Sequence, residues 1–84
     1  MLKIKKGDIV KYDENIEKIK EITFKANADF IDYYCAELEI EFESGRFYYD
    51  EITSFEHNIE WIKERLYDNA NYLVEKVGEI NETN

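Results

Sequence analysis

The middle of the chain alternates strictly between apolar and acidic residues. Every second position from 36 to 42 is apolar, and glutamates fill the positions between and directly after them: Ala36, Glu37, Leu38, Glu39, Ile40, Glu41, Phe42 and Glu43. Successive side chains of a strand point to opposite faces of its sheet. This segment is therefore predicted to be a half-buried strand that presents carboxylates to solvent on one face.

An aromatic run follows this strand after a Ser-Gly dipeptide that is typical of turns. Positions 46–50 read Arg-Phe-Tyr-Tyr-Asp, so the two runs are predicted to form a hairpin. With a two-residue loop, Glu41 faces Tyr48 and Glu39 faces Asp50. In that register the acidic face of the hairpin includes both Tyr48 and Asp50.

The N-terminal third begins with one clear strand signal and then becomes ambiguous. Residues 9–12 are a β-branched and aromatic run, and the turn-forming residues 13–15 close it. Residues 16–24 fit two structures, because isoleucine first recurs every third residue, as on a helix, and apolar residues then alternate, as in a strand. Both structures remain open for this stretch, and residues 25–29 are interpreted as a loop.

Helical periodicity begins at residue 54. Apolar residues there recur every three or four positions: Phe55, Ile59, Ile62, Leu66, Ala70, Leu73 and Val77. This spacing predicts an amphipathic helix over residues 54–77. Thr53 and Glu56 have the spacing of a capping box, and Asn58 is a competing N-cap. Gly78 stands where a glycine that ends a helix is expected.

Strand signals first and a long helix last predict an α+β fold in a single domain, residues 1–84. We expect a β-rich part over residues 1–52, in which a small, strongly bent antiparallel sheet covers about residues 5–52. The helix of residues 54–77 would then cover the apolar face of the sheet. The tail, residues 79–84, is expected to fray.

Two short segments resemble small SH3-like barrels, which are common in bacterial and phage genomes. They are Lys-Gly-Asp-Ile-Val-Lys-Tyr at residues 6–12 and Tyr-Tyr-Asp-Glu-Ile at residues 48–52. The resemblance covers roughly residues 5–55 and implies a closed barrel as the alternative to the open sheet. It implies no activity, because such barrels carry many unrelated functions.

The net charge of the chain indicates which kind of partner it can bind. Its 84 residues contain 20 Asp and Glu against 11 Lys and Arg, which gives a formal net charge of −9. That balance argues against direct binding of nucleic acid or of an anionic membrane and favours a basic partner. No apolar run approaches the about 18 residues of a membrane span, and no signal peptide pattern opens the sequence. We therefore expect a cytoplasmic protein.

The alternating glutamates are the best candidate for a binding surface. Same-face residues of a strand lie about 6.6–6.8 Å apart, so the carboxylates would line up regularly, as DNA phosphates do. A rigid row of this kind fits the Lys/Arg groove of a nucleic-acid-binding protein. The candidate partner-binding residues are Glu37, Glu39, Glu41, Glu43, Tyr48 and Asp50.

In size, charge and β-plus-α make-up the chain resembles phage-encoded DNA-mimic inhibitors. These include many anti-CRISPR and anti-restriction proteins and the uracil-DNA glycosylase inhibitor. The resemblance implies a non-enzymatic inhibitor, encoded by a phage or mobile element, that occupies the nucleic-acid-binding groove of a host defence protein. A CRISPR effector or a restriction enzyme is the expected target.

Two other interpretations remain open at this point. The glutamates are also consistent with a solvated strand face that discourages aggregation. The chain is also consistent with a small structural or adaptor module whose helix pairs with a partner or forms a homodimer. The single His57 and the single Cys35 give no pattern for catalysis, and no phosphate loop or metal-binding motif is present. We expect no catalytic residues, no metal and no cofactor.

Overall fold

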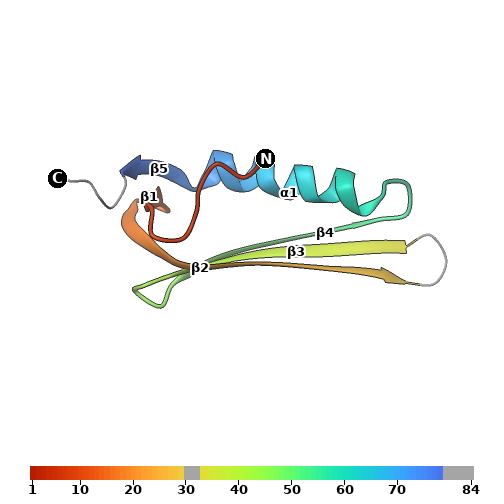
Figure 1. The fold of residues 1–84 in the computed structure, drawn as a ribbon, viewed down its shortest axis with the longest axis horizontal. Helices are drawn as coiled ribbons and strands as arrows, with labels where there is room; N and C mark the ends of the chain where they lie inside the picture. The colour runs from red at the N-terminus through yellow and green to blue at the C-terminus, as the bar shows by residue number, and fades with distance from the viewer. Residues whose placement is uncertain (30–32, 79–84) are drawn as a thin grey trace.

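The computed structural model describes residues 1–29 and 33–78, which form one antiparallel sheet and one helix (Figure 1). The elements are β1 Ile9–Tyr12, β2 Asn15–Asp29, β3 Tyr33–Phe42, β4 Phe47–Ser54, α1 Ile59–Leu73 and β5 Glu75–Gly78. The strands are ordered β4-β3-β2-β1-β5. The α+β prediction is confirmed. The sheet is open, so the SH3-like barrel alternative is wrong. The fraying predicted for residues 79–84 concerns a segment that lies outside the described residues.

The long strand β2 joins the two parts of the sheet. Its first residues, Asn15–Lys18, pair with β1, and its remainder, from Ile19 onward, pairs with β3. A bulge between Ile19 and Glu21 lies at the change of partner. Bulges bend a strand and increase its twist, which explains the strong bend of the sheet. Residues 16–24 are therefore strand, and the loop predicted for residues 25–29 is wrong because β3 pairs with that backbone.

Arg46 pairs with Phe42, so the hairpin of β3 and β4 is closed by a three-residue loop, residues 43–45, and not by the predicted two-residue loop. The Phe42 N–H donates to Arg46 O, and the Gly45 N–H donates to Phe42 O, each at 2.9 Å. Gly45 has φ +96°, a left-handed conformation that glycine adopts at no steric cost. Three-residue hairpin loops commonly combine a type I turn with such a left-handed residue. The extra loop residue shifts the pairing of β4 by one position.

The helix is shorter than predicted at both ends. The Asn58 side chain caps its start by accepting from Trp61 N at 3.0 Å, so the competing N-cap is correct and the Thr53–Glu56 capping box is wrong. The helix ends at Leu73, and the residues after it form β5, which pairs with β1. Gly78 is thus the last residue of a strand and does not end the helix.

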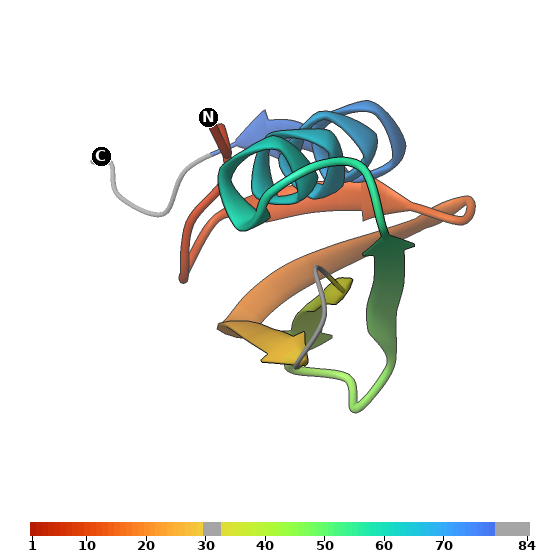
Figure 2. The same cartoon turned by 90° about the vertical axis from the view of Figure 1, so that its right-hand side faces the viewer.

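One hydrophobic core lies between α1 and the inner face of the sheet (Figure 2). The four alternating apolar residues of β3 are all buried, as predicted, and α1 packs against β3 and β4. The buried hydrophobic residues are Ile4, Val10, Ile19, Ala36, Leu38, Ile40, Phe42, Tyr48, Ile62, Leu66, Ala70 and Val74. Phe55 of the predicted helical stripe precedes α1 and is exposed.

Candidate functional site

The outer face of β3 presents the predicted carboxylates. Glu37, Glu39 and Glu41 alternate with buried residues on this strand, so their side chains lie on the face opposite the core. Glu43 follows in the loop, and its N–H donates to Lys18 O at 2.9 Å. The structure therefore places three of the four glutamates on one strand face and the fourth at its end.

Tyr49 is the aromatic residue of this outer face. It lies opposite Glu39 in the register of the hairpin and is 46% exposed. Its hydroxyl donates toward two carboxylates and lies 2.7 Å from Glu37 Oε1 and 3.2 Å from Glu51 Oε1. The hydrogen bond to Glu37 raises the pKa of Tyr49 above its usual range. A shared donor between two facing carboxylates offsets part of their repulsion.

Tyr48 and Asp50, predicted on the acidic face, lie on the opposite side of the sheet. The one-residue change of register sets Tyr48 opposite Ile40 and Asp50 opposite Leu38, because a slip of one residue turns every side chain to the other face. Tyr48 is buried, whereas Asp50 is half-buried. Their predicted placement beside the glutamates is therefore wrong, and Tyr49 takes that place.

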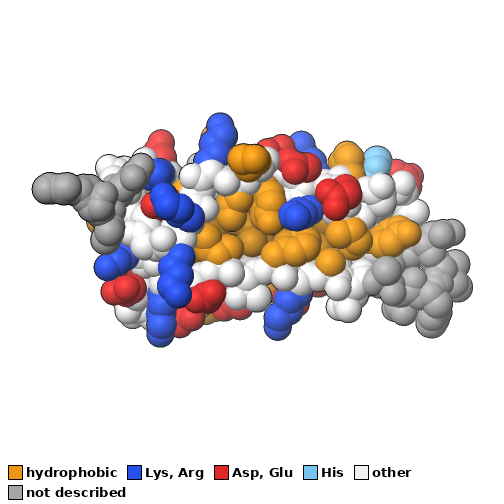
Figure 3. All heavy atoms as spheres, viewed as in Figure 1, with side chains coloured by type: hydrophobic (Ala, Val, Ile, Leu, Met, Phe, Trp, Pro, Cys, Tyr) orange, Lys and Arg blue, Asp and Glu red, His pale blue; other side chains and the backbone are white. Residues whose placement is uncertain are grey.

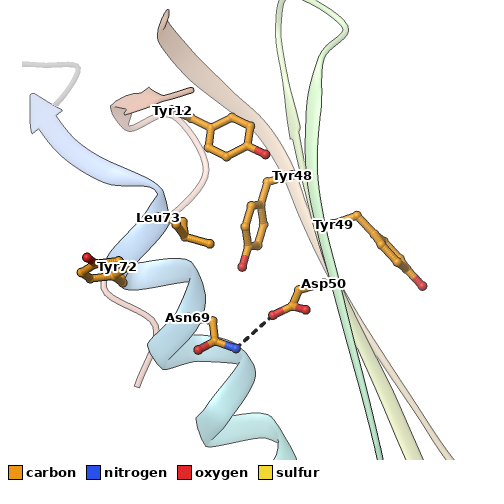
Figure 4. Close-up of a pocket in the computed structure, with 7 residues that line it drawn as sticks. All are labelled: Tyr12, Tyr48, Tyr49, Asp50, Asn69, Tyr72 and Leu73. Atoms are coloured by element: carbon orange, nitrogen blue, oxygen red, sulfur yellow. Dashed lines mark hydrogen bonds between the residues drawn. The ribbon is translucent and has the colours of Figure 1, made fainter. Parts of the chain in front are cut away.

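Tyr48 and Asp50 instead line an open pocket of about 520 Å³ between β4, β1 and the end of α1 (Figure 4). Asn69 Nδ2 donates to Asp50 Oδ2 at 3.2 Å, and the rings of Tyr12 and Tyr48 make an edge contact at 5.6 Å. Burial, followed by the charge of Asp50, raises the pKa of Tyr48 to about 12. The Tyr49 ring points away from this pocket.

Lysines of β2 border the glutamate row on one side only. Lys20 Nζ lies 3.8 Å from Glu41 Oε2, and Lys18 Nζ lies 3.8 Å from Glu43 Oε2. All four of these side chains are substantially exposed, so each ion pair adds little stability. On the other side, β4 adds a carboxylate, Glu51, and no cation within its described residues. The negative charge of the outer face is therefore densest toward β4.

The described residues contain no other arrangement with an obvious chemistry. No group of three or more His, Cys, Asp or Glu side chains among them is placed to hold a metal ion. Cys35 Sγ donates to Glu51 Oε2 at 3.4 Å, and the His57 ring stacks on Trp61 at 3.8 Å. In this part of the chain no helix has both the length and the apolar character needed to cross a membrane.

A scan of protein-family profiles, a search of curated proteins and a search of solved structures each find no match to this chain. The function of the chain is therefore inferred from the geometry of the outer face.

Proposed function

We propose that this chain is a non-enzymatic binding protein that docks on the nucleic-acid-binding groove of a basic protein. The contact surface, called here the acidic face, consists of six of the outward side chains of β3 and β4: Glu37, Glu39, Glu41, Phe47, Tyr49 and Glu51. Glu43 borders it in the loop. A host defence nuclease, such as a CRISPR effector or restriction enzyme, is the proposed target, and inhibition by a phage or mobile element is the proposed role.

The observation that carries this proposal is the position of the glutamate row on a central strand whose inner face is buried. Glu39 lies between Leu38 and Ile40, which are both 0% exposed, and β3 is paired on both sides by β2 and β4. The backbone that carries the carboxylates therefore cannot rearrange without disrupting the core. Preorganised charges bind with a smaller entropic cost than mobile ones.

The spacing and chemistry of the row suit a groove that binds phosphates. Alternate residues on a strand are about 6.6–6.8 Å apart, roughly twice the 3.4 Å of helix axis that each phosphate of one DNA strand occupies. Carboxylates accept the same charge-assisted hydrogen bonds from Arg and Lys that phosphates accept. Tyr49 and Phe47, 46% and 55% exposed, add aromatic surface of the kind that anchors protein interfaces.

The competing proposal, a module that acts through its helix, would need apolar residues of α1 that are partly buried in the core. Its apolar seam includes Ile62 and Leu66, and both are 0% exposed because they pack against the sheet. A partner helix can reach these residues only if α1 leaves the core. The acidic face requires no such rearrangement, and we therefore favour it.

The test is displacement of fluorescent DNA from a panel of purified restriction endonucleases and RNA-guided nucleases. We expect the protein to displace DNA from at least one of them, with an affinity that falls as salt rises. The double reversal Glu39→Lys with Glu41→Lys should weaken displacement more than tenfold.

The matched control reverses Glu60 and Asp68, which are exposed on α1, and changes the net charge by the same amount. It should weaken displacement less than threefold. Equal losses in the two double variants would overturn the assignment of the acidic face. Failure to displace DNA from every nuclease of the panel would overturn the proposed target class.

A further inference from the structure

One edge of the sheet is open within the described residues. The N-terminal segment bonds to β2 as far as Ile19, through Gly7 N to Ile19 O at 2.9 Å and Ile19 N to Asp8 O at 3.0 Å. Beyond Ile19, β3 pairs with one side of β2, and no described strand pairs with the other side. Residues 20–27 therefore present unpaired backbone groups along one edge, which is a template for a further strand.

The register of the hairpin shows which backbone groups face this edge. In antiparallel strands both polar groups of a residue point to the same neighbour, and successive residues alternate. The Phe42 N–H points toward β4, so Glu39, three residues away, directs its groups toward β2. Thr23 is the register partner of Glu39 and uses its groups on β3. Ile22 and Phe24, on either side of Thr23, consequently direct their groups to the open edge.

Apolar side chains lie beside this edge on the inner side of the sheet. Ile22 and Phe24 are half-buried, and the Phe24 ring lies 6.1 Å from the ring of Tyr67 on α1. Lys63 Nζ lies 5.6 Å from the centre of the Phe24 ring. Figure 3 shows hydrophobic side chains gathered on the surface between the helix and the sheet. The helix therefore leaves the inner side of the open edge partly uncovered.

The edge of β4 is less suited to pairing with a further strand, because carboxylates lie on both of its faces. Asp50 points to the core side and Glu51 to the outer side, and β4 has no Lys or Arg. An inward-pointing charge on an edge strand discourages pairing with another chain. Residues 20–27 carry both signs of charge and alternate them with apolar residues, so this segment has the composition of a pairing edge.

We propose that two copies of this chain pair antiparallel along residues 20–26 of β2, about a twofold axis at Thr23. In this register each Ile22 lies opposite Phe24 of the second copy, on the inner side of the joined sheet. Each Glu21 lies opposite Lys25 of the second copy, on the outer side. The polar groups of Ile22 and Phe24 exchange hydrogen bonds across the axis, as an isologous interface requires.

Charge favours this register, because an axis at Thr23 is the one that sets Glu21 opposite Lys25. Moving the twofold axis to Lys25 sets two lysines opposite each other, and moving it to Glu21 sets two glutamates opposite each other, which is unfavourable. Glu21 already has a weak ion pair with Lys6, at 3.5 Å, and both side chains are more than half exposed. The Glu21 carboxylate therefore remains accessible to a second cation.

The test is a charge swap followed by analytical ultracentrifugation. We expect the unchanged protein to dimerise reversibly, with a mass that approaches twice 10.1 kDa at high concentration. Glu21→Lys alone and Lys25→Glu alone should each weaken dimerisation about tenfold, because each sets like charges opposite at two symmetric positions. The double variant, and an equimolar mixture of the two single variants, should restore it.

Glu51→Lys is the matched control, because Glu51 is exposed on the edge strand β4. It should change the dimer dissociation constant less than twofold, and circular dichroism should show that all variants stay folded. A protein that is monomeric at about 1 mM overturns the proposal. A dimer that Glu51→Lys weakens, or that the charge swap leaves unaffected, overturns it as well. The result does not depend on the proposed nuclease target.

Discussion

The two sides of the β3–β4 hairpin carry neighbouring residues but have different roles, because one side packs in the core and the other faces outward. On the inner side, Leu38 and Ile40 are 0% exposed and hold the helix to the sheet. On the outer side, Glu39 and Tyr49 face each other, and the Tyr49 hydroxyl donates to Glu37. The inner positions are therefore constrained by packing. The outer positions can be substituted to suit a binding partner without disrupting the core.

The sharpest test of this comparison is a truncation on each side of the same strand. Leu38→Ala should lower the free energy of unfolding by about 3 kcal/mol, because it removes buried apolar atoms and leaves a cavity. Glu39→Ala should change it by less than about 0.5 kcal/mol. Urea unfolding of both variants measures the difference. Similar losses in the two variants would mean that the inner and outer positions contribute equally to the free energy of unfolding.

A second test uses the alkaline titration of Tyr48. The pKa of Tyr48 is raised to about 12 in the folded protein, whereas an ordinary tyrosine has a pKa of about 10. The contribution of the neutral Tyr48 to stability is therefore fully present below about pH 10. It is lost as the pH rises from there toward 12. We expect the free energy of unfolding to fall by about 1 to 2 kcal/mol between pH 9.5 and 11.5, discounted for partial solvent screening.

The contribution of Tyr48 is isolated by substitution. Tyr48→Phe should lose correspondingly less stability over the same pH interval, as measured by urea unfolding at both pH values. Tyr72→Phe should behave like the unchanged protein, because Tyr72 is 86% exposed. If the two variants lose the same free energy of unfolding between pH 9.5 and 11.5, the ionisation of Tyr48 does not cause the loss.

The smallest expected effect concerns the loop that decides which side each residue occupies. Gly45→Ala should lower the free energy of unfolding by about 1 kcal/mol, because alanine is strained at φ +96°. Gly78→Ala is the control, since a Cβ there makes an ordinary contact of 3.7 Å with Ile9. Thermal unfolding of the pair checks the prediction, and a larger loss in the control would contradict the loop geometry.

The alternation of β3 was enough to predict its buried residues, because the period of two is local and strict. The side of Tyr48 was not predictable from alternation, since it depends on one extra residue in the loop. Gly45 at the end of the Glu-Ser-Gly sequence was the available signal, as glycine is favoured at the left-handed position of a three-residue loop. The predicted placement of Glu37, Glu39 and Glu41 on one face is therefore confirmed, and the predicted placement of Tyr48 and Asp50 beside them is wrong.

Non-local pairing explains the other differences between sequence and structure. The Lys25–Asp29 segment has weak strand propensity, and it is extended because β3 pairs with it along its whole length. The residues of β5 fit the end of a helix when viewed locally, and only their pairing with β1 makes them a strand. Neither effect has a signature within a short window of sequence.

The pairing of β5 with β1 also sets an order of events during synthesis. Ile9 and Gly78 are register partners, so the first described strand leaves the ribosome long before its neighbour exists. Contacts between distant residues form slowly, because a long loop must close first. The β2–β3–β4 meander can collapse early, whereas β1 has to wait with one edge unsatisfied until residue 78 has emerged. During that interval the nascent chain depends on the solubility that its many carboxylates provide.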